Sequence, residues 1–242
     1  MNRRLIIVGL PIDLLTSAET DLKLEHFLAT PGLQVISTLN PELVIQASRQ
    51  ESLKKYVHSS ALVTADGSGI ILMAKLTGQA AGWSERLTGV DLTRKLLDLA
   101  VQKQLRLVII MKEPAYASPE QVTEALRRQW PGLEFELIAW PAGNQLRAPL
   151  SGDIILVTLG MPEQELWIDQ HRRQLEGFKI AVGVGGTFDF LSGKIKRAPR
   201  WLQTIGLEWL WRLLLRPGRM WRRVFRALII FPYLAWTKRH DQ

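Results

Sequence analysis

A glycine turn with the chemistry of a phosphate site lies between residues 180 and 191. An apolar run of strand length, residues 180–182, leads directly into three glycines, Gly183, Gly185 and Gly186. Thr187 follows as the expected cap of a short helix. A strand, a glycine turn and a helix N-terminus together present backbone N–H groups to a phosphate. The alternative is a tight turn without a ligand, because short glycine motifs recur in unrelated proteins.

Asp66 stands where a catalytic base would be useful. It comes shortly after the apolar run 61–64, which has the length of a short strand, and directly before Gly67. A carboxylate held at a strand end can take a proton from a reacting hydroxyl group. The alternative is an aspartate that stabilises the turn or caps the next helix.

The positive charge of the chain is concentrated in its last fifth. The 242 residues carry 31 Lys and Arg against 23 Asp and Glu, a net charge of +8. Residues 194–242 hold 12 of the basic residues and two acidic ones, a net of +10, so residues 1–193 carry a net of −2. This asymmetry indicates an anionic partner: a phospholipid surface, a lipid-linked phosphate or a nucleic acid.

The tail, defined here as residues 196–242, combines arginine with large apolar side chains. Its arginines recur every three or four residues: Arg212, Arg216, Arg219, Arg222, Arg223 and Arg226. Between and before them stand Trp209, Leu213, Met220, Trp221, Val224 and Phe225. Such a helix suits a membrane interface, and no apolar run reaches the ~18 residues of a membrane span. The alternative is a helical pair packed on the core with solvated arginines.

Strand-like and helix-like segments alternate before the tail. Strands are expected at residues 5–8, 33–37, 61–64, 107–111, 135–140, 154–158 and 179–182. Helices are expected at 17–29, 41–50, 52–58, 69–76, from Asp91, 118–130 and 162–175, with Ser17, Asn40, Asp91 and Ser118 as N-caps. In the tail, a helix over 202–215 precedes one over 217–231. This order predicts an α/β fold: a Rossmann-like parallel sheet flanked by helices, with an all-helical basic appendage.

Parallel strands place their carboxyl ends at one edge of the sheet, and ligands of such sheets bind there. The loops expected at that edge are residues 38–40, 65–67, 160–164 and 183–186. We therefore expect Asp66 and the glycine turn to lie at the same edge.

Cysteine and histidine, two common metal ligands, are absent or scarce in this sequence. There is no cysteine, and the four histidines show no close spacing. Disulfides, cysteine metal sites and a histidine-built metal site are therefore not expected. Residues 5–10, although apolar, are interpreted as a first buried strand rather than as a signal peptide, because Pro11 and Asp13 interrupt the run.

Five segments, in order, carry a family resemblance. They are residues 37–42 (STLNPE), 65–69 (ADGSG), 85–92 (ERLTGVDL), 160–167 (GMPEQELW), and 183–201 with its continuation GLEW at 206–209. Together they resemble the WecG/TagA/CpsF family of bacterial glycosyltransferases, over residues 5 to 226. Members of that family transfer N-acetylmannosamine, or its uronic acid, from UDP to a polyprenyl-diphosphate-linked N-acetylglucosamine.

The resemblance implies roles for residues of this chain. Asp66 matches the catalytic aspartate, the base for the acceptor hydroxyl, while Thr38 and Gln164 match positions that orient the sugar. Positions that would face the nucleotide are Asn40, Gly183, Gly185, Gly186 and Asp189. The structural alternatives are capping for Thr38, Asn40 and Asp189, and a solvated helix surface for Gln164.

Four arginines are expected to neutralise the substrate diphosphate: Arg86, Arg212, Arg219 and Arg222. Arg86 lies in a polar loop, where a surface salt bridge is the alternative. The other three match arginines of the family's C-terminal appendage, and guanidinium groups bind phosphate bidentately. Because the chain has no DxD-type carboxylate pair, cationic side chains and helix N-termini are expected in place of a metal. This agrees with the metal-independent, inverting and cofactor-free transfer that the resemblance implies.

The resemblance also implies an organisation and a set of partners. Residues 1–195 would form the nucleotide-sugar-binding catalytic domain, and residues 196–242 a basic, tryptophan-rich membrane-binding appendage. The expected partners are a UDP-sugar donor, a polyprenyl-diphosphate-linked sugar acceptor and an anionic membrane surface, and no nucleic acid; a homo-oligomer is left open. The expected location is cytoplasmic, peripheral on the inner face of the cell membrane.

Two turns depart from the family pattern. Residues 111–116 read MKEPAY where the family has a glycine-rich turn, and residues 141–144 read PAGN where it has a Gly-Tyr or Gly-Phe element. They keep open a second hypothesis, a catalytically altered relative that acts as a binding or scaffold protein. A third, a nucleic-acid binder that uses the tail, predicts a steep salt dependence. The near-neutral core and the interleaved tryptophans count against it.

Overall fold

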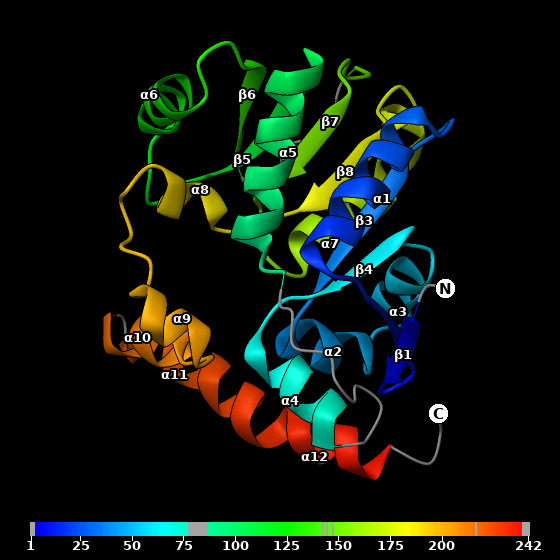
Figure 1. Cartoon of the computed structure of the whole chain (residues 1–242), viewed down its shortest axis with the longest axis vertical. Coiled ribbons are helices and arrows are strands. Elements are labelled where there is room, and N and C mark those ends of the chain that lie inside the picture. The colour runs from blue at the N-terminus through cyan, green and yellow to red at the C-terminus, as the bar shows by residue number, and fades with distance from the viewer. Residues whose placement is uncertain are drawn as a thin grey trace.

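The chain is built around a six-stranded parallel sheet with the strand order β4-β3-β8-β7-β5-β6 (Figure 1). The computed structural model describes residues 3–76, 87–141, 143, 145, 146, 148–215 and 217–238. The strands are β3 (Gln34–Leu39), β4 (Leu62–Ala65), β5 (Arg106–Glu113), β6 (Glu134–Pro141), β7 (Ile154–Val157) and β8 (Ile180–Gly183). The predicted α/β fold is confirmed.

Helices cover both faces of this sheet. They are α1 (Ser17–Ala29), α2 (Pro41–Ala47), α3 (Glu51–His58), α4 (Ser68–Leu76), α5 (Gly89–Lys103), α6 (Pro119–Gln129), α7 (Glu163–Gln170) and α8 (Thr187–Leu191), with a 3-10 turn η1 (Arg172–Leu175). Side chains of β5 alternate between two apolar clusters, since Val108 and Ile110 enter one and Leu107 and Ile109 the other. The first cluster contains residues of α2, α3, α4 and α7, and the second residues of α1, α5, α6 and α8.

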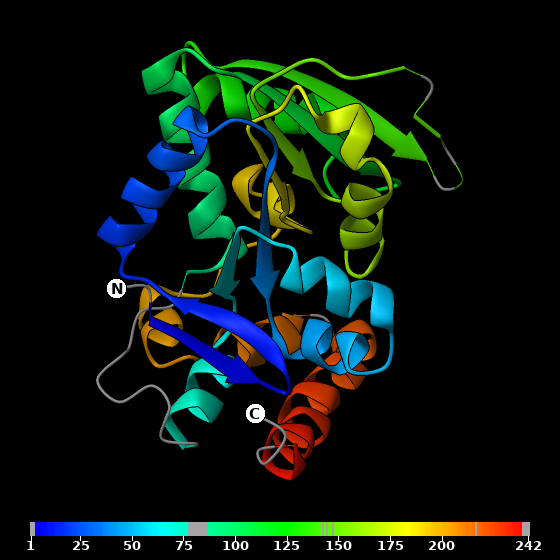
Figure 2. The same cartoon turned by 90° about the vertical axis from the view of Figure 1, so that its right-hand side faces the viewer.

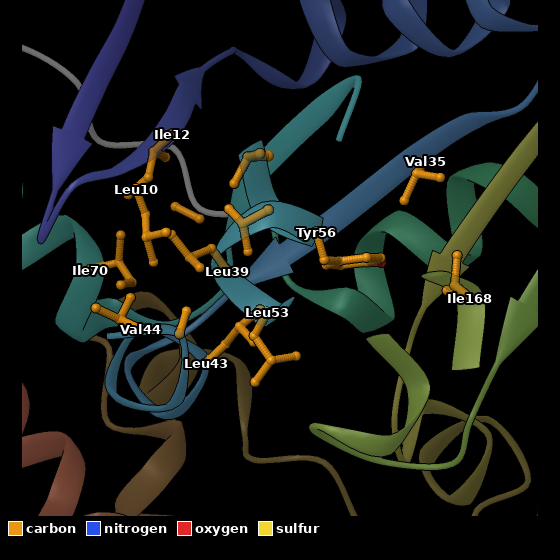
Figure 3. Close-up of a cluster of buried hydrophobic side chains, with 14 of the residues drawn as sticks. Leu10, Ile12, Val35, Leu39, Leu43, Val44, Leu53, Tyr56, Ile70 and Ile168 are labelled. Atoms are coloured by element: carbon orange, nitrogen blue, oxygen red, sulfur yellow. The ribbon is translucent and has the colours of Figure 1, made fainter. Parts of the chain in front are cut away.

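The first predicted strand belongs to a hairpin outside the parallel sheet. β1 (Arg3–Ile7) pairs antiparallel with β2 (Leu10–Leu14) through Val8 and Gly9, which both have positive φ angles, as a two-residue hairpin requires. Leu10 and Ile12 of β2 enter the core beside α2 and α4 (Figure 3). The buried carboxylate of Asp13 accepts the Val63 N–H at 2.8 Å and so joins the hairpin to β4.

The predicted N-caps are right for two helices and wrong for two. Asn40 caps α2 and Ser118 caps α6, as predicted. α1 is capped by Thr16 rather than Ser17, and α5 by Thr88 rather than Asp91. In both corrected cases the threonine hydroxyl accepts the N–H three residues later, which places the helix start earlier than the sequence pattern indicated.

The tail is mostly helical from residue 200 to residue 237 in its described part, but its breaks differ from the prediction. It contains α9 (Arg200–Thr204), α10 (Glu208–Leu215), α11 (Pro217–Phe225), the π-helical η2 (Arg226–Ile230) and α12 (Phe231–Thr237). A single helix over 202–215 is wrong, because Gly206 has a φ angle of +78° and its carbonyl accepts the Ser68 hydroxyl at 2.8 Å. The second predicted helix continues past residue 231 to Thr237.

One side of the tail packs on the core and the other faces solvent. The rod α11–η2–α12 runs along the lower edge of the molecule in Figure 1, and Figure 2 shows it obliquely from its α12 end. Phe231 and Ala235 are buried in the first apolar cluster, and Arg226 forms an ion pair with Glu42 of α2 at 2.7 Å. The helices in the described part of the chain include none that is long and apolar enough to cross a membrane. The division into residues 1–195 and 196–242 stays a prediction.

Candidate active site

A cavity of about 230 Å³ lies at the carboxyl ends of the strands, where the loops were expected to meet. All four predicted loops contribute to its lining, with Thr38, Asn40, Asp66, Gly160, Gln164 and the turn 184–186. The tail contributes Leu215, Met220 and Arg223. Residues far apart in the sequence are therefore brought to one place by the parallel sheet and closed off by the tail.

Asp66 lies at the end of β4, facing the start of α5. Its backbone N–H bonds the Leu39 carbonyl at 2.7 Å, which fixes the chain as it leaves the sheet. A Cβ placed on Gly89 would lie 3.7 Å from the Asp66 Oδ2 atom, so the carboxylate is close to the first residue of α5. The partial positive charge of that helix end favours an ionised carboxylate. This is a suitable environment for a base, the role that stays a prediction for Asp66.

Side chains of other elements contact the glycine turn, residues 183–186, and fix its backbone. The buried Thr38 hydroxyl donates to the Gly183 carbonyl at 3.1 Å. A Cβ on Gly183 would lie 2.6 Å from the Gln164 Nε2 atom, and Gly185 has a φ angle of +52°, so both positions require glycine. Thr187 is not the cap of α8: its hydroxyl donates to the Val184 carbonyl at 2.7 Å, and Gly186 occupies the cap position.

Gln164 is buried rather than on a solvated helix surface. Its exposed fraction is 4%, its Oε1 atom accepts the Gly185 N–H at 2.9 Å, and its Nε2 atom donates to Glu165 at 2.8 Å. The Gly185 N–H is therefore engaged within the protein. A direct contact of Gln164 with the sugar stays a prediction.

Glu165 was missed by the sequence reasoning. It is 2% exposed, and its Oε2 atom has no hydrogen-bond partner among the described residues. Burial raises the pKa of Glu165 to about 7, against the opposing effects of the Gln164 hydrogen bond and the Arg223 charge. The available signal was its place beside Gln164 in the segment GMPEQELW, directly before the buried Trp167.

Asn40 and Asp189 line the cavity and also have structural roles. The Asn40 Oδ1 atom accepts the N–H groups of Glu42 and Leu43, each at 3.1 Å, which confirms its capping role. Asp189 accepts the Ala117 N–H at 3.1 Å and so holds the loop after β5, in which the departure at 111–116 ends. Their contact with a nucleotide stays a prediction.

The predicted arginines are only partly within the described residues. Arg86 lies outside them, as do the side chains of Arg212 on α10 and Arg219 on α11. Arg222 is exposed, with its guanidinium 5.4 Å from the centre of the Trp221 ring, and it is not among the residues that line the cavity. The next residue, Arg223, does line it and was not predicted.

Arg197 ties the start of the tail to the first turn of α5. Its guanidinium bonds the Asp91 carboxylate at 2.9 Å and the Thr88 hydroxyl at 3.3 Å, and lies 3.6 Å from Glu208 of α10. Asp91 is thus an ion-pair partner instead of a cap. Gly89, which these contacts border, forms part of the cavity wall.

The described residues contain no group of three or more His, Asp or Glu side chains that could hold a metal ion. Metal-independent and cofactor-free transfer stays a prediction.

Comparison with known proteins gives one consistent result. The family model described as "Glycosyl transferase WecG/TagA/CpsF family" matches residues 5–242. An N-acetylglucosaminyldiphosphoundecaprenol N-acetyl-beta-D-mannosaminyltransferase of Bacillus spizizenii is 32% identical, over 94% of this chain and 87% of its own. Proteins of the same name from Bacillus subtilis (30% identical, 83% and 78% covered) and Staphylococcus aureus (26%, 96% and 92%) are also similar.

Proposed function

The chain belongs to the glycosyl transferase WecG/TagA/CpsF family, and from this premise we propose which substrates it takes. The donor is a UDP-sugar, UDP-N-acetylmannosamine or a close relative. The acceptor is a polyprenyl-diphosphate-linked N-acetylglucosamine, used in the synthesis of a cell-surface polysaccharide. The relatives' names support the transferred sugar and the acceptor lipid.

The observation that carries this proposal is the meeting of Asp66, the glycine turn and Arg223 around one cavity. A glycosyl transfer needs a base beside the acceptor hydroxyl and positive charge beside the departing diphosphate. Asp66 supplies the first at the end of β4. Arg223 supplies the second from α11, together with the arginines predicted from the sequence.

The reaction is a single displacement at the anomeric carbon of the donor. Asp66 accepts the proton of the acceptor hydroxyl while that oxygen forms the new bond to the anomeric carbon. The bond from this carbon to the UDP phosphate oxygen breaks, and UDP leaves with the electron pair. One displacement inverts the configuration at this carbon, so a donor that is alpha-linked to UDP would give the beta linkage in the relatives' names.

The tail brings the enzyme to its lipid-linked acceptor. Its exposed large apolar side chains are Trp201, Ile205, Leu214, Leu215, Trp221, Phe225, Leu228, Ile229, Tyr233 and Trp236. With a net charge of +10 over residues 194–242, this surface suits the interface of an anionic membrane. We propose that the enzyme is a peripheral membrane protein and that it works at the cytoplasmic face.

A donor screen tests the proposal. Purified protein is incubated with a polyprenyl-diphosphate-N-acetylglucosamine analogue and a panel of UDP-sugars, and products are identified by mass. We expect one product, heavier than the acceptor by one N-acetylhexosamine residue, with UDP-N-acetylmannosamine. UDP binding without transfer from any donor would instead favour the altered relative that acts as a binding protein. Absence of both would overturn the proposal.

A further inference from the structure

Glu165 of α7 is a buried acid that lies beneath the cavity wall without lining it. It is 2% exposed, and burying a carboxyl group is costly unless the group is hydrogen-bonded or paired with a charge. Its Oε1 atom accepts a hydrogen bond from another side chain, Gln164 Nε2, at 2.8 Å. The role of this bond follows from the other contacts of the Gln164 amide.

The Gln164 amide is held at both of its ends. Its oxygen accepts the Gly185 N–H at 2.9 Å, and its nitrogen donates to Glu165. While the Glu165 carboxyl is ionised, a reversed amide would place NH₂ against the Gly185 N–H and an oxygen against a carboxylate oxygen, so both contacts would be repulsive. The acceptor that Glu165 offers thus selects the amide orientation that Gly185 needs.

The same amide sits tightly against the glycine turn. A Cβ on Gly183 would lie 2.6 to 2.8 Å from three atoms of the Gln164 side chain. The turn on the other side of this contact lines the cavity with Val184, Gly185 and Gly186. A displacement of Gln164 would therefore move the backbone that faces the donor.

We propose that Glu165 is a positioning residue for donor binding: it fixes the Gln164 amide and, through the Gln164–Gly185 hydrogen bond, the shape of the turn 183–186. The identity of the donor rests on the proposed function, whereas the linkage from Glu165 to Gly185 does not. Arg223 of α11 and Tyr56 of α3 are the groups that share an electrostatic interaction with this carboxyl. Tyr56 and Ile168 of α7 face the same part of the core (Figure 3).

Two substitutions separate positioning from folding. Glu165→Gln keeps an oxygen that can accept from Gln164, so the amide orientation and UDP affinity should stay within about twofold of wild type. Glu165→Leu removes the acceptor while filling a similar volume. UDP affinity, measured by calorimetry, should fall about tenfold, the usual cost of an intramolecular hydrogen bond of this kind. Glu163→Leu, on the exposed side of the same helix, is the matched control and should leave UDP affinity unchanged.

A second readout needs no ligand. Hydrogen exchange of the Gly185 amide, followed by NMR, should be about tenfold faster in Glu165→Leu and unchanged in Glu165→Gln. In a Gln164→Ala background, Glu165→Leu should have no further effect on UDP affinity, because Glu165 acts through Gln164. Melting temperatures of all variants confirm that the fold is kept.

The outcomes separate the two proposals. Unchanged Gly185 exchange and unchanged UDP affinity in a folded Glu165→Leu protein would overturn the positioning role. So would an equal loss of affinity in Glu165→Leu with and without Gln164. If Gly185 exchange responds as expected but the wild-type protein binds no UDP, Glu165 positions the turn and the proposed donor is wrong.

Discussion

The cavity has two walls that are built differently. On the core side, Thr38, Gln164 and Asn40 bond backbone groups of other turns and helices, so this wall is fixed by the sheet. On the tail side, Leu215, Met220 and Arg223 come from helices whose outer faces expose large apolar side chains. The polar side chains of the core wall are thus hydrogen-bonded within the protein, whereas the tail exposes apolar surface that a partner can cover. We infer that the core wall sets donor binding and the tail sets access of the acceptor.

The largest expected effect comes from removing the proposed general base, which leaves both walls of the cavity intact. Asp66→Asn should lower turnover by ~10²–10⁴-fold, the usual loss for a general base, because an amide cannot take the acceptor proton. UDP affinity and melting temperature should stay at wild-type values. Steady-state assays and calorimetry check this, with the exposed Asp21→Asn as control. Turnover close to wild type would remove Asp66 from the mechanism.

The next effect concerns the tail alone. Changing Trp221 and Phe225 together to Ser removes two half-exposed rings and should weaken binding to anionic vesicles roughly 100-fold, at about 1.5 kcal/mol for each ring. UDP affinity should not change, because neither residue lines the cavity. Vesicle co-sedimentation at two salt concentrations measures the loss. Leu22→Ser, an exposed leucine on α1, is the control and should sediment like wild type.

A third change tests the core wall by itself. Gly185→Val forces a β-branched residue to a φ angle of +52°, at a cost of about 1–2 kcal/mol, and should lower UDP affinity about tenfold. Gly132→Val is the matched control, since Gly132 also has a positive φ angle, +86°, but lies in open space in the turn after α6. It should lose similar stability and keep its UDP affinity. Equal UDP affinity in both variants would mean that the turn is structural only.

The order of strands and helices along the chain could be predicted from the sequence. The β1–β2 hairpin, and which side chains of a helix face the cavity, could not. Alternating apolar runs predicted the parallel sheet, and the strand ends brought Asp66 and Gly185 to one cavity. The hairpin was missed because Pro11 and Asp13 interrupt the apolar pattern of β2, although both pair within it. An apolar pattern with such interruptions does not show that a second strand follows the first.

Site residues beside the predicted ones were missed for a related reason. Successive residues on a helix point about 100° apart, so selecting Arg222 rather than Arg223 changes which guanidinium reaches the cavity. Gln164 and Glu165 are both buried because α7 packs toward the glycine turn, where Gly185 lies 21 residues after Gln164. Local spacing cannot show that contact, since the sheet creates it.

The smallest expected effect tests how the two walls are joined. Arg226 of η2 pairs with Glu42 of α2 at 2.7 Å, and the Glu42 side chain is 11% exposed while that of Arg226 is 48% exposed. Because the arginine is half solvated, the pair is worth little more than a surface ion pair, about 1 kcal/mol.

Arg226→Met should therefore lower the melting temperature by roughly 2–4 °C, the shift expected for that loss in a chain of this size. The remaining Glu42 Oε1 contact to Gln46 Nε2, at 3.2 Å, limits the damage, and the methionine still covers the apolar surface of α2. Adding Glu42→Gln to Arg226→Met should restore part of the loss, because it removes the buried charge left unpaired. If the tail is joined to the core through this pair, Arg226→Met should also reduce turnover with vesicle-bound acceptor more than UDP affinity. Equal losses of both would show that the two walls act as one unit, and the contrast between them would then not hold.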